Sequence, residues 1–325
     1  MDLSVRIERW PLERAFTISR GAKTEAVVVV AELEDGHRGR GEAVPYARYG
    51  ETPEGVAAAI EALRPALRRG LDRAALQAAL PAGAARNALD CAFWDFEAKR
   101  GGRRAYELAA LPPPQPLVTA YTISLADPET MAQAAASASA RPLLKVKLGG
   151  GDDDVERIAA VRGAAPKTEL IVDANEGWSE RDLERNLAAC ARARVTLVEQ
   201  PLPRGHDDRL AQITRVIPVC ADESVHDRAS LDLLKGKYDA INVKLDKTGG
   251  LTEALALALE AERYGFVIMV GCMVATSLAM APAMLVAQRA RIVDLDGPLL
   301  LAKDRPHGLR FDGSVVYPSE PILWG

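Results

Sequence analysis

The stretch Leu143-Leu-Lys-Val-Lys147 is a short apolar run that ends in a charged side chain, and four similar runs follow it. The runs are LLKVK, ELIVDAN, VTLVEQ, PVCADES and AINVK, and their polar residues Lys147, Asp173, Glu199, Asp222 and Lys244 are 26, 26, 23 and 22 positions apart. One strand and its helix take about 25–30 residues of a TIM-type barrel, whose catalytic groups lie at the carboxyl ends of the strands. The spacing therefore predicts a barrel in which these five side chains form one ring.

Eight short runs in the later part of the chain have the length and apolar character of barrel strands. Stretches with helical patterning fill most of the gaps between them, as in a closed α/β barrel. After residue 296, turns marked by glycine and proline take the place of a last helix. The fold class that we predict is therefore α/β, a modified TIM barrel of the form (β/α)7β, with strands at Val118–Ser124, Leu143–Leu148, Leu170–Asp173, Leu197–Glu199, Val219–Ala221, Ala240–Lys244, Val267–Val270 and Ile292–Asp294.

The first hundred residues have a different pattern, which predicts an α+β domain. Strand-like runs at Ser4–Glu8 and Ala26–Glu34 flank a polar connector at 19–24, and a turn at 35–36 leads to a return strand at Arg38–Glu42. Helical patterning then extends from residue 53 to about residue 100, and prolines at 112–114 interrupt it. We expect an α+β capping domain over residues 1–112, the barrel over 113–305, and a C-terminal segment, 306–325, that returns to the capping domain.

Composition indicates an ordinary globular enzyme of 325 residues with a net charge of −4. This charge, without a basic stripe, argues against nucleic acid as a partner. No apolar run reaches the roughly 18–20 residues of a membrane span. The four scattered cysteines include no CxxC pair and are predicted to be reduced, mostly buried thiols in a cytoplasmic protein. A homo-oligomer is compatible with the sequence.

Asp173, Glu199 and Asp222 come from three consecutive predicted strands and have no histidine near them. For any one of them alone, a strand-end salt bridge would be the simpler explanation. Three buried carboxylates in one ring are strongly disfavoured unless a cation compensates their charge. Ligands that are all oxygen suit Mg²⁺ or Mn²⁺ and argue against zinc or copper. We therefore predict a Mg²⁺ site, with Mn²⁺ as the alternative ion.

Lys147 and Lys244 end the second and sixth predicted strands, which face each other across an eight-stranded barrel. A lysine that is desolvated near other cations can lose its proton near neutral pH and act as a general base. Lys145 points the same way as Lys147, because strand side chains alternate, and could help to hold an oxyanion. The pattern predicts proton abstraction beside a carboxylate, with the metal ion bound where negative charge develops.

Several motifs resemble those of the enolase superfamily, in its muconate-lactonizing-enzyme subgroup. They are KVKL at 145–148, IVDANEGW at 171–178, VEQPL at 198–202, ADES at 221–224, INVKLDKTGG at 241–250 and, in the capping domain, PAGAARNALDCAFWD at 81–95. The resemblance covers essentially the whole chain. It implies 1,1-proton transfer through an enediolate, and this superfamily is itself a standard example of a lysine base that works with Mg²⁺.

The Asp294-Leu-Asp296 sequence resembles the paired aspartates with which the dipeptide epimerases of this superfamily bind the ammonium of the N-terminal amino acid. A buried cation needs such paired carboxylates. The neighbouring GP at 297–298 and GCM at 271–273 are similar to the Ala-Glu epimerases of murein peptide recycling. The resemblance implies a Mg²⁺-dependent isomerase that interconverts L-Ala-L-Glu and L-Ala-D-Glu, with Lys147 serving the (R) centre and Lys244 the (S) centre.

Four more residues fall at substrate-binding positions of the family. Thr122 and Cys272 match positions of the substrate pocket. Lys23 stands where some close relatives have an arginine that recognises a glutamate side chain, and Arg20 could serve instead. Either cation favours an acidic second residue in the dipeptide, although lysine and arginine are not equivalent.

Three other interpretations of the function stay open. An o-succinylbenzoate synthase, an N-acylamino acid racemase or a cycloisomerase would keep the fold, but its substrate lacks a free ammonium and does not need Asp294 or Asp296. An epimerase for a different dipeptide would change only the pocket. A non-catalytic metal-binding or ligand-binding barrel would have no use for two opposed lysines.

Overall fold

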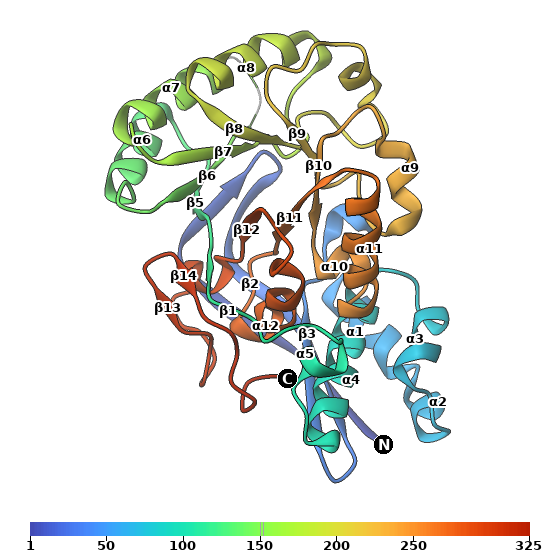
Figure 1. Ribbon diagram of the computed structural model, residues 1–325. Helices are drawn as coiled ribbons and strands as arrows, with labels where there is room; N and C mark the ends of the chain where they lie inside the picture. The colour runs from blue at the N-terminus through green and yellow to red at the C-terminus, as the bar shows by residue number, and fades with distance from the viewer. Residues whose placement is uncertain (150, 152) are drawn as a thin grey trace.

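Eight parallel strands form the barrel, and each overlaps a run that the sequence predicts (Figure 1). A computed structural model describes residues 1–149, 151 and 153–325. The Ala120 amide donates to the Val293 carbonyl at 2.8 Å, which joins the two ends of the sheet. The predicted modified TIM barrel is confirmed, with its strands side by side in chain order: β5 (Tyr121–Ile123), β6 (Leu143–Lys147), β7 (Glu169–Asp173), β8 (Val195–Glu199), β9 (Val219–Ala221), β10 (Ala240–Val243), β11 (Val267–Gly271) and β12 (Ile292–Asp294).

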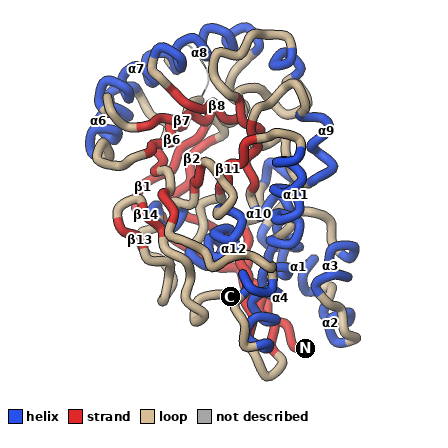
Figure 2. Tube along the Cα trace, in the orientation of Figure 1, coloured by secondary structure: helices blue, strands red, loops and turns tan. Residues whose placement is uncertain are grey.

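Helices cover the outside of the barrel (Figure 2). The connections after β8 and β9 are short helical turns, and β12 leads into the 3-10 helix η4 (Gly297–Leu300) in place of an eighth α-helix. The helical elements of this region are α6 (Pro128–Ser137), α7 (Asp154–Ala164), α8 (Glu180–Arg192), η2 (Asp208–Ala211), η3 (Arg228–Ser230), α9 (Leu231–Leu234), α10 (Leu245–Thr248), α11 (Leu251–Arg263) and α12 (Ser277–Ala287).

The side chains inside the barrel form layers, and the charged residues lie together in one of these layers. One buried side chain from each strand or its start forms an apolar layer: Ala120, Leu143, Ile171, Leu197, Cys220, Ala240, Met269 and Ile292. Side chains two positions further along each strand point to the same side, because strand side chains alternate. The next layer towards the carboxyl ends is therefore mostly polar and consists of Thr122, Lys145, Asp173, Glu199, Asp222, Asn242, Gly271 and Asp294.

The N-terminal sheet contains β1 (Asp2–Ile18), β2 (Gly21–Glu34) and β3 (Arg38–Ala43) in antiparallel order. The predicted polar connector at 19–24 is wrong, because pairing continues to Ile18 and Gly21 and leaves only Ser19 and Arg20 at the turn. The helical patterning expected from residue 53 to about residue 100 is present as four α-helices, with breaks at 62–63, 69–72 and 80–83. The helices are η1 (Ala47–Tyr49), α1 (Pro53–Glu61), α2 (Arg64–Arg68), α3 (Arg73–Ala79), α4 (Ala84–Gly101) and α5 (Ala105–Leu108).

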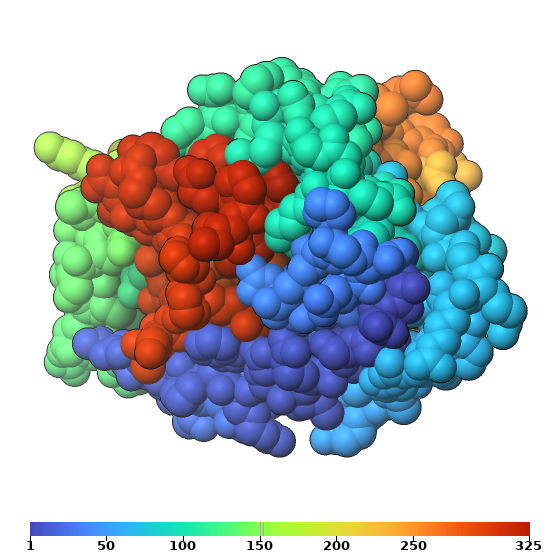
Figure 3. Space-filling view, turned by 90° about the horizontal axis from the view of Figure 1, so that it is seen from below, coloured from blue at the N-terminus to red at the C-terminus, as the bar shows by residue number. Residues whose placement is uncertain are grey.

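The C-terminal residues cross between the two parts of the molecule. The hairpin of β13 (Phe311–Asp312) and β14 (Val315–Val316) pairs with β4 (Leu117–Val118), beside the barrel. Beyond it, the Trp324 indole donates to the carbonyl of Cys91 on α4 at 3.0 Å. Figure 3 shows this C-terminal part, in red, against the N-terminal strands, in blue. The domain boundaries at 112/113 and 305/306 stay predictions.

Buried polar contacts join the capping domain to the barrel. Asp246 on α10 accepts hydrogen bonds from the Val44 amide at 2.8 Å and the Asn87 side chain at 2.9 Å. Arg86 on α4 donates to the carbonyl of Thr248 at 2.7 Å. Burial, together with the nearby negative charges of the capping domain, raises the pKa of Asp246 to about 7.

The Asp246→Asn variant is expected to remove part of the pH dependence of stability. A folded-state pKa raised from 3.8 to about 7 means that the contribution of Asp246 is fully present below pH 3.8 and is lost as the pH rises through 7. Between about pH 5 and about pH 8 the wild type should lose about 2 kcal/mol of unfolding free energy relative to Asp246→Asn. Urea unfolding of both proteins at both pH values measures this difference, and parallel pH profiles would contradict it.

Among the described residues, no helix is both long and apolar enough to cross a membrane. All four cysteines are free thiols, and only Cys272 is not fully buried.

Candidate active site

A cavity of about 770 Å³ opens between the carboxyl ends of the barrel strands and the tip of the β1–β2 hairpin. Nine of the twelve predicted site residues line it: Arg20, Lys23, Thr122, Lys147, Asp222, Lys244, Cys272, Asp294 and Asp296. The other three, Lys145, Asp173 and Glu199, are buried next to them, with side chains at most 1% exposed. The structure thus brings all of the predicted side chains to one end of the barrel.

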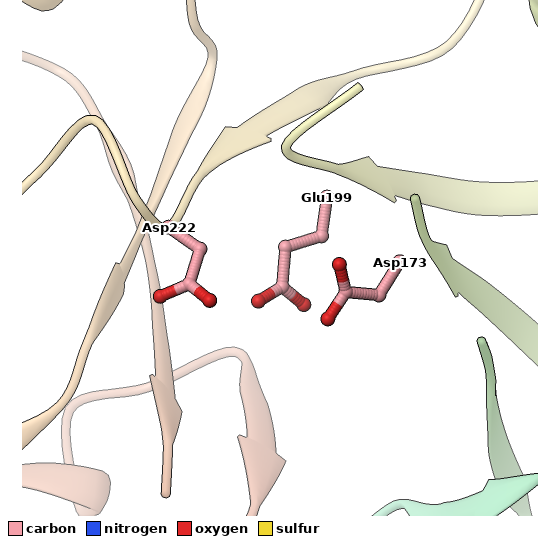
Figure 4. A group of neighbouring side chains, drawn as sticks. All are labelled: Asp173, Glu199 and Asp222. Atoms are coloured by element: carbon pink, nitrogen blue, oxygen red, sulfur yellow. The ribbon is translucent and has the colours of Figure 1, made fainter. Parts of the chain in front are cut away.

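Asp173, Glu199 and Asp222 offer oxygen atoms that all lie within 4.8 Å of one another. Figure 4 shows their carboxylates turned towards a shared space, with Glu199 between the two aspartates. One oxygen of Glu199 accepts from the Asn242 amide at 2.7 Å, and the other lies 2.7 Å from the Lys145 ammonium. A buried set of three carboxylates, each with two oxygen donors, fits a hard cation such as Mg²⁺.

The three acids differ in proton affinity because their charged neighbours differ. Burial raises the pKa of Glu199 to about 7, and the negative charge of Asp173 adds to this effect. Burial acts in the same direction on both aspartates, but neighbouring lysines outweigh it. Lys147 and Lys145 hold the pKa of Asp173 below its usual range, and Lys244 and Lys247 do the same for Asp222. The aspartates are therefore ionised at neutral pH.

Lys147 ends β6 and Lys244 directly follows β10, and these are the second and sixth of the eight strands, which are opposite in the ring. Both line the cavity. The Lys147 ammonium lies 2.6 Å from Asp173, and the Lys244 ammonium lies 2.6 Å from Asp222. Each lysine is therefore anchored to one carboxylate of the triad while facing the same space.

The expected low pKa is not found at Lys244. Burial alone would lower the pKa of its ammonium, but the charge of Asp222 raises it well above the usual value. In this arrangement Lys244 is in its proton-donating form.

Lys145 is held by three carboxylates at the centre of the ring. Its ammonium lies 2.7 Å from Glu199, 2.8 Å from Asp294 and 3.2 Å from Asp173. These charges raise the pKa of Lys145 well above the usual value, although burial opposes them. The side chain is therefore a permanent positive charge beside the triad.

Lys247 is a residue that the sequence reasoning missed. Its ammonium is fully buried and donates to the Asp222 carboxylate at 2.6 Å, to the Asp222 carbonyl at 2.5 Å and to the Asn242 carbonyl at 2.9 Å. Lys247 therefore fixes the direction of Asp222. Its place one helical turn after Lys244, within the INVKLDKTGG motif, was the available signal.

Asp294 and Asp296 lie side by side on the cavity wall. Asp296 accepts from the Thr122 amide at 2.7 Å, and one oxygen of Asp294 is buried without a hydrogen bond to any described residue. Burial, and then the charge of Asp294, raise the pKa of Asp296 to about 7. Two close acids with unused acceptor capacity are suited to an incoming ammonium. Cys272 lies on the same wall.

The hairpin tip brings Arg20 and Lys23 to the cavity, but they differ in their contacts. Arg20 donates to Glu223 at 2.6 Å, to the Tyr46 hydroxyl at 2.8 Å and to the Asn175 carbonyl at 2.7 Å. Lys23 has no carboxylate partner among the described residues, and its ammonium lies 5.4 Å from the Tyr46 ring centre. Arg20 thus fastens the hairpin to the barrel, while Lys23 is left available to a ligand.

Glu223 is the second residue that sequence reasoning missed, although it stands in the ADES motif beside Asp222. Burial, then the charges of Asp222 and Asp173, raise the pKa of Glu223 to about 6. Its partner Arg20 comes from a segment about two hundred residues earlier in the chain, which explains why the sequence alone gives no sign of the pair.

A capped barrel with an acid triad between two lysines defines a class of barrel isomerase. Comparison with known proteins agrees with this. Residues 1–109 match the mandelate racemase/muconate lactonizing enzyme N-terminal domain, and residues 129–320 match the enolase C-terminal domain-like family. The chain therefore belongs to the mandelate racemase/muconate lactonizing enzyme family of the enolase superfamily, as its motifs predict.

Its relatives are epimerases and racemases, which are isomerases. The chain is 47% identical to the L-Ala-D/L-Glu epimerase of Escherichia coli K12, over 94% of this chain and 95% of that protein. It is also 47% identical to an N-acetyl-D-glutamate racemase of Pseudoalteromonas, over 92% and 94% of the two chains.

Solved structures are similar over nearly the whole chain. An enolase family member from Agrobacterium tumefaciens with homology to dipeptide epimerases, crystallised with sodium and L-Ala-L-Glu, matches with a TM-score of 0.98 at 56% identity, over 99% of both chains. A dipeptide epimerase from Enterococcus faecalis, complexed with Mg and L-Leu-L-Tyr, matches with a TM-score of 0.90 at 28% identity, over 98% and 96% of the chains.

Proposed function

We propose that this protein is a Mg²⁺-dependent dipeptide epimerase that interconverts L-Ala-L-Glu and L-Ala-D-Glu. The observation that carries the proposal is that Lys147 and Lys244, from opposite strands, line one cavity above an acid triad. The likeness to the Escherichia coli epimerase and to the Agrobacterium protein that holds L-Ala-L-Glu supports the choice of substrate.

The two lysines carry out the proton transfer. One lysine, as a neutral amine, takes the α-proton of the C-terminal residue, and the other, as an ammonium, delivers a proton to the opposite face. The configuration inverts and no atom is gained or lost. In the assignment implied by the family, Lys147 serves the (R) centre and Lys244 the (S) centre. Lys145, buried beside the triad, supplies a fixed positive charge near the substrate carboxylate, where negative charge develops.

Asp173, Glu199 and Asp222 would hold the metal ion. When bound, Mg²⁺ would stabilise the negative charge on the carboxylate of the substrate. We propose Mg²⁺ as the native ion because all three ligands are hard oxygens and a structural relative was crystallised with it. Mn²⁺ has similar ligand preferences and is the alternative.

The function is tested by incubating the protein with Mg²⁺ and L-Ala-L-Xaa dipeptides in D₂O. We expect L-Ala-L-Glu to gain one deuterium at the α-carbon of its second residue and to yield L-Ala-D-Glu. Mass spectrometry follows the first change and chiral chromatography the second. If no dipeptide in the set gains deuterium, the proposal is wrong.

The second residue of the dipeptide is proposed to contact Lys23. Partial desolvation by the surrounding loop, and then the charge of Arg20, lower the pKa of Lys23, so a nearby carboxylate would favour its charged form. We expect Lys23→Met to raise KM for L-Ala-L-Glu about tenfold, the value of one charge-assisted hydrogen bond, and to change KM for L-Ala-L-Gln much less. Equal effects on the two substrates would argue for a contact elsewhere.

Racemisation of an N-acylated glutamate is a second candidate, favoured by the likeness to the Pseudoalteromonas racemase. Such a substrate would use the same lysines and triad. It has no ammonium, and therefore no need for the two acids at 294 and 296.

The Asp296→Asn variant separates these two candidates. An amide keeps an acceptor for the Thr122 amide but removes the charge that would face a substrate ammonium. We expect kcat/KM for L-Ala-L-Glu to fall by about 10–100-fold, a loss of about 1.4–2.8 kcal/mol, with little change for N-acetylglutamate. Full retention of dipeptide activity would favour the racemase.

The cellular setting is also a proposal. Four free thiols support a reducing compartment such as the cytoplasm. A role in murein peptide recycling follows from the proposed substrate. We expect small dipeptides as partners rather than nucleic acid, and the homo-oligomeric state can be measured by light scattering.

A further inference from the structure

A second cavity, of about 280 Å³, lies where the N-terminal sheet meets the C-terminal segment. We call it the β3 pocket. Its walls include Arg38, Arg40, Lys99, Arg305, His307 and Ile322, and it shares no lining residue with the active-site cavity. Figure 3 shows the region where these parts of the chain, blue, green-blue and red, come together. Among the described residues that line the pocket, four are permanent cations and none is acidic.

The strand geometry explains why the arginines gather here. Arg38 and Arg40 alternate with Gly39 and Gly41 along β3, so both arginines project from one side of the strand. The two glycines face α4 at close range: a Cβ on Gly39 would lie 2.3 Å from the Ala92 carbonyl oxygen, and one on Gly41 would lie 2.1 Å from that of Ala88. Because α4 packs tightly against the glycine side of β3, the arginines project from the opposite side.

The ion pairs of these cations leave hydrogen-bond donors unused. Arg305 is the most enclosed of them, and it contacts Glu42 and Glu8, both at 2.6 Å. Arg38 contacts Glu32 through its Nη2 atom. In the part of the chain that the structure describes, the Nη1 atoms of Arg38, Arg40 and Arg305 make no hydrogen bond to protein.

Arg40 is the least compensated of the four cations. Its guanidinium donates to two neutral acceptors, the carbonyls of Ile322 at 2.9 Å and Leu323 at 2.7 Å. The nearby Asp95 is engaged by Lys99 at 2.8 Å and by the Arg40 amide at 2.8 Å. Burial, with the charges of Arg38 and Arg305, lowers the pKa of Arg40 although Asp95 opposes this. An anion in the pocket would relieve this repulsion.

We propose that the β3 pocket binds a compact oxyanion with two or more negative charges, for which inorganic phosphate is the probe. Guanidinium groups with free donors match the oxygens of phosphate or carboxylate in pairs. The pocket walls come from β3, α4 and the segment after the barrel, so a bound anion would tie these three parts together. Ligands that bind only the folded state raise its stability, so the anion should also raise the unfolding temperature.

The test is calorimetric titration of phosphate into the full-length protein at constant ionic strength. The Arg38→Gln/Lys99→Gln double variant removes one exposed and one partly buried cation from the pocket and leaves Arg40 and Arg305 in place. We expect its Kd for phosphate to rise about tenfold or more, because two charge-assisted contacts are lost. The matched control is Arg289→Gln, which removes an exposed arginine paired with Glu262 outside the pocket. Its Kd should stay that of the wild type.

Three outcomes would overturn the proposal. The first is a titration that shows no saturable binding of phosphate. The second is a Kd that is unchanged in the double variant, which would place the anion elsewhere, for example in the active site. The third is an equal loss in the Arg289→Gln control, which would indicate general surface charge. Parallel titrations with sulfate and citrate distinguish a tetrahedral oxyanion from a polycarboxylate, and binding of either in the same variant-sensitive way supports the site.

Discussion

Replacing Lys147 or Lys244 by alanine is expected to abolish epimerisation while the protein still folds and binds metal. In the proposed mechanism each lysine serves one face of the reacting carbon, so the loss of either amine should stop the inversion. A positioned general acid or base contributes about 10²–10⁴-fold to rate, and we expect kcat to fall by at least about 10³-fold in each variant. Chiral chromatography of L-Ala-L-Glu after long incubation measures this loss.

Isotope exchange gives the sharper result, because each variant keeps one working lysine. In D₂O, Lys147→Ala should still exchange the α-proton of L-Ala-L-Glu, which has the (S) centre, but not that of L-Ala-D-Glu. Lys244→Ala should show the reverse. The control is Lys235→Ala, which removes an exposed lysine paired with Asp232 at 2.7 Å. Interconversion by either active-site variant at the wild-type rate would exclude the two-lysine mechanism.

Replacing one acid of the triad by its amide is expected to have the second largest effect. Asp222→Asn removes one of the three proposed charged ligands, and we expect Mg²⁺ affinity to fall by about 10²-fold and kcat/KM to fall with it. Calorimetry, or Mn²⁺ binding followed by electron paramagnetic resonance, measures the affinity independently of activity. Chelation with EDTA should remove wild-type activity, and added Mg²⁺ should restore it.

The neighbouring Glu223→Gln variant is the matched control for the triad. Glu223 is buried and directly follows Asp222 in the sequence. Its carboxylate pairs with Arg20, and it is not one of the three clustered acids. We expect it to keep Mg²⁺ affinity within a few-fold of the wild type. If Glu223→Gln loses as much affinity as Asp222→Asn, the triad of Asp173, Glu199 and Asp222 is not the metal site.

The barrel could be predicted from the sequence because its strands repeat one pattern. Each apolar run ends in a polar side chain, and the alternation of strand side chains places that residue at the open end. The tip of the β1–β2 hairpin was not predicted, because local composition there gives no sign of strand pairing. The polar residues at 19–24 do not look like strand, yet pairing between Ile18 and Gly21 extends the hairpin almost to its tip.

The site residues that were predicted can be identified from local sequence, whereas those that were missed depend on their partners in the fold. Asp173 and Lys147 end their own strands, so local sequence identifies them. The missed residues are Lys247, which matters because it contacts Asp222, and Glu223, which matters because it pairs with Arg20. These partners are up to about two hundred residues away in the chain, and only the folded barrel brings them together.

The β1–β2 hairpin extends from the core of the N-terminal sheet to the mouth of the barrel. Its second strand has 14 residues, a span of roughly 45 Å at about 3.3 Å per residue. Folding of the sheet depends on the buried base of this hairpin, whereas the reactive groups all stand on the barrel. Substitutions at the tip can therefore accumulate in a lineage without loss of fold or chemistry. Such a division lets natural selection exchange one preferred peptide for another in a few mutational steps.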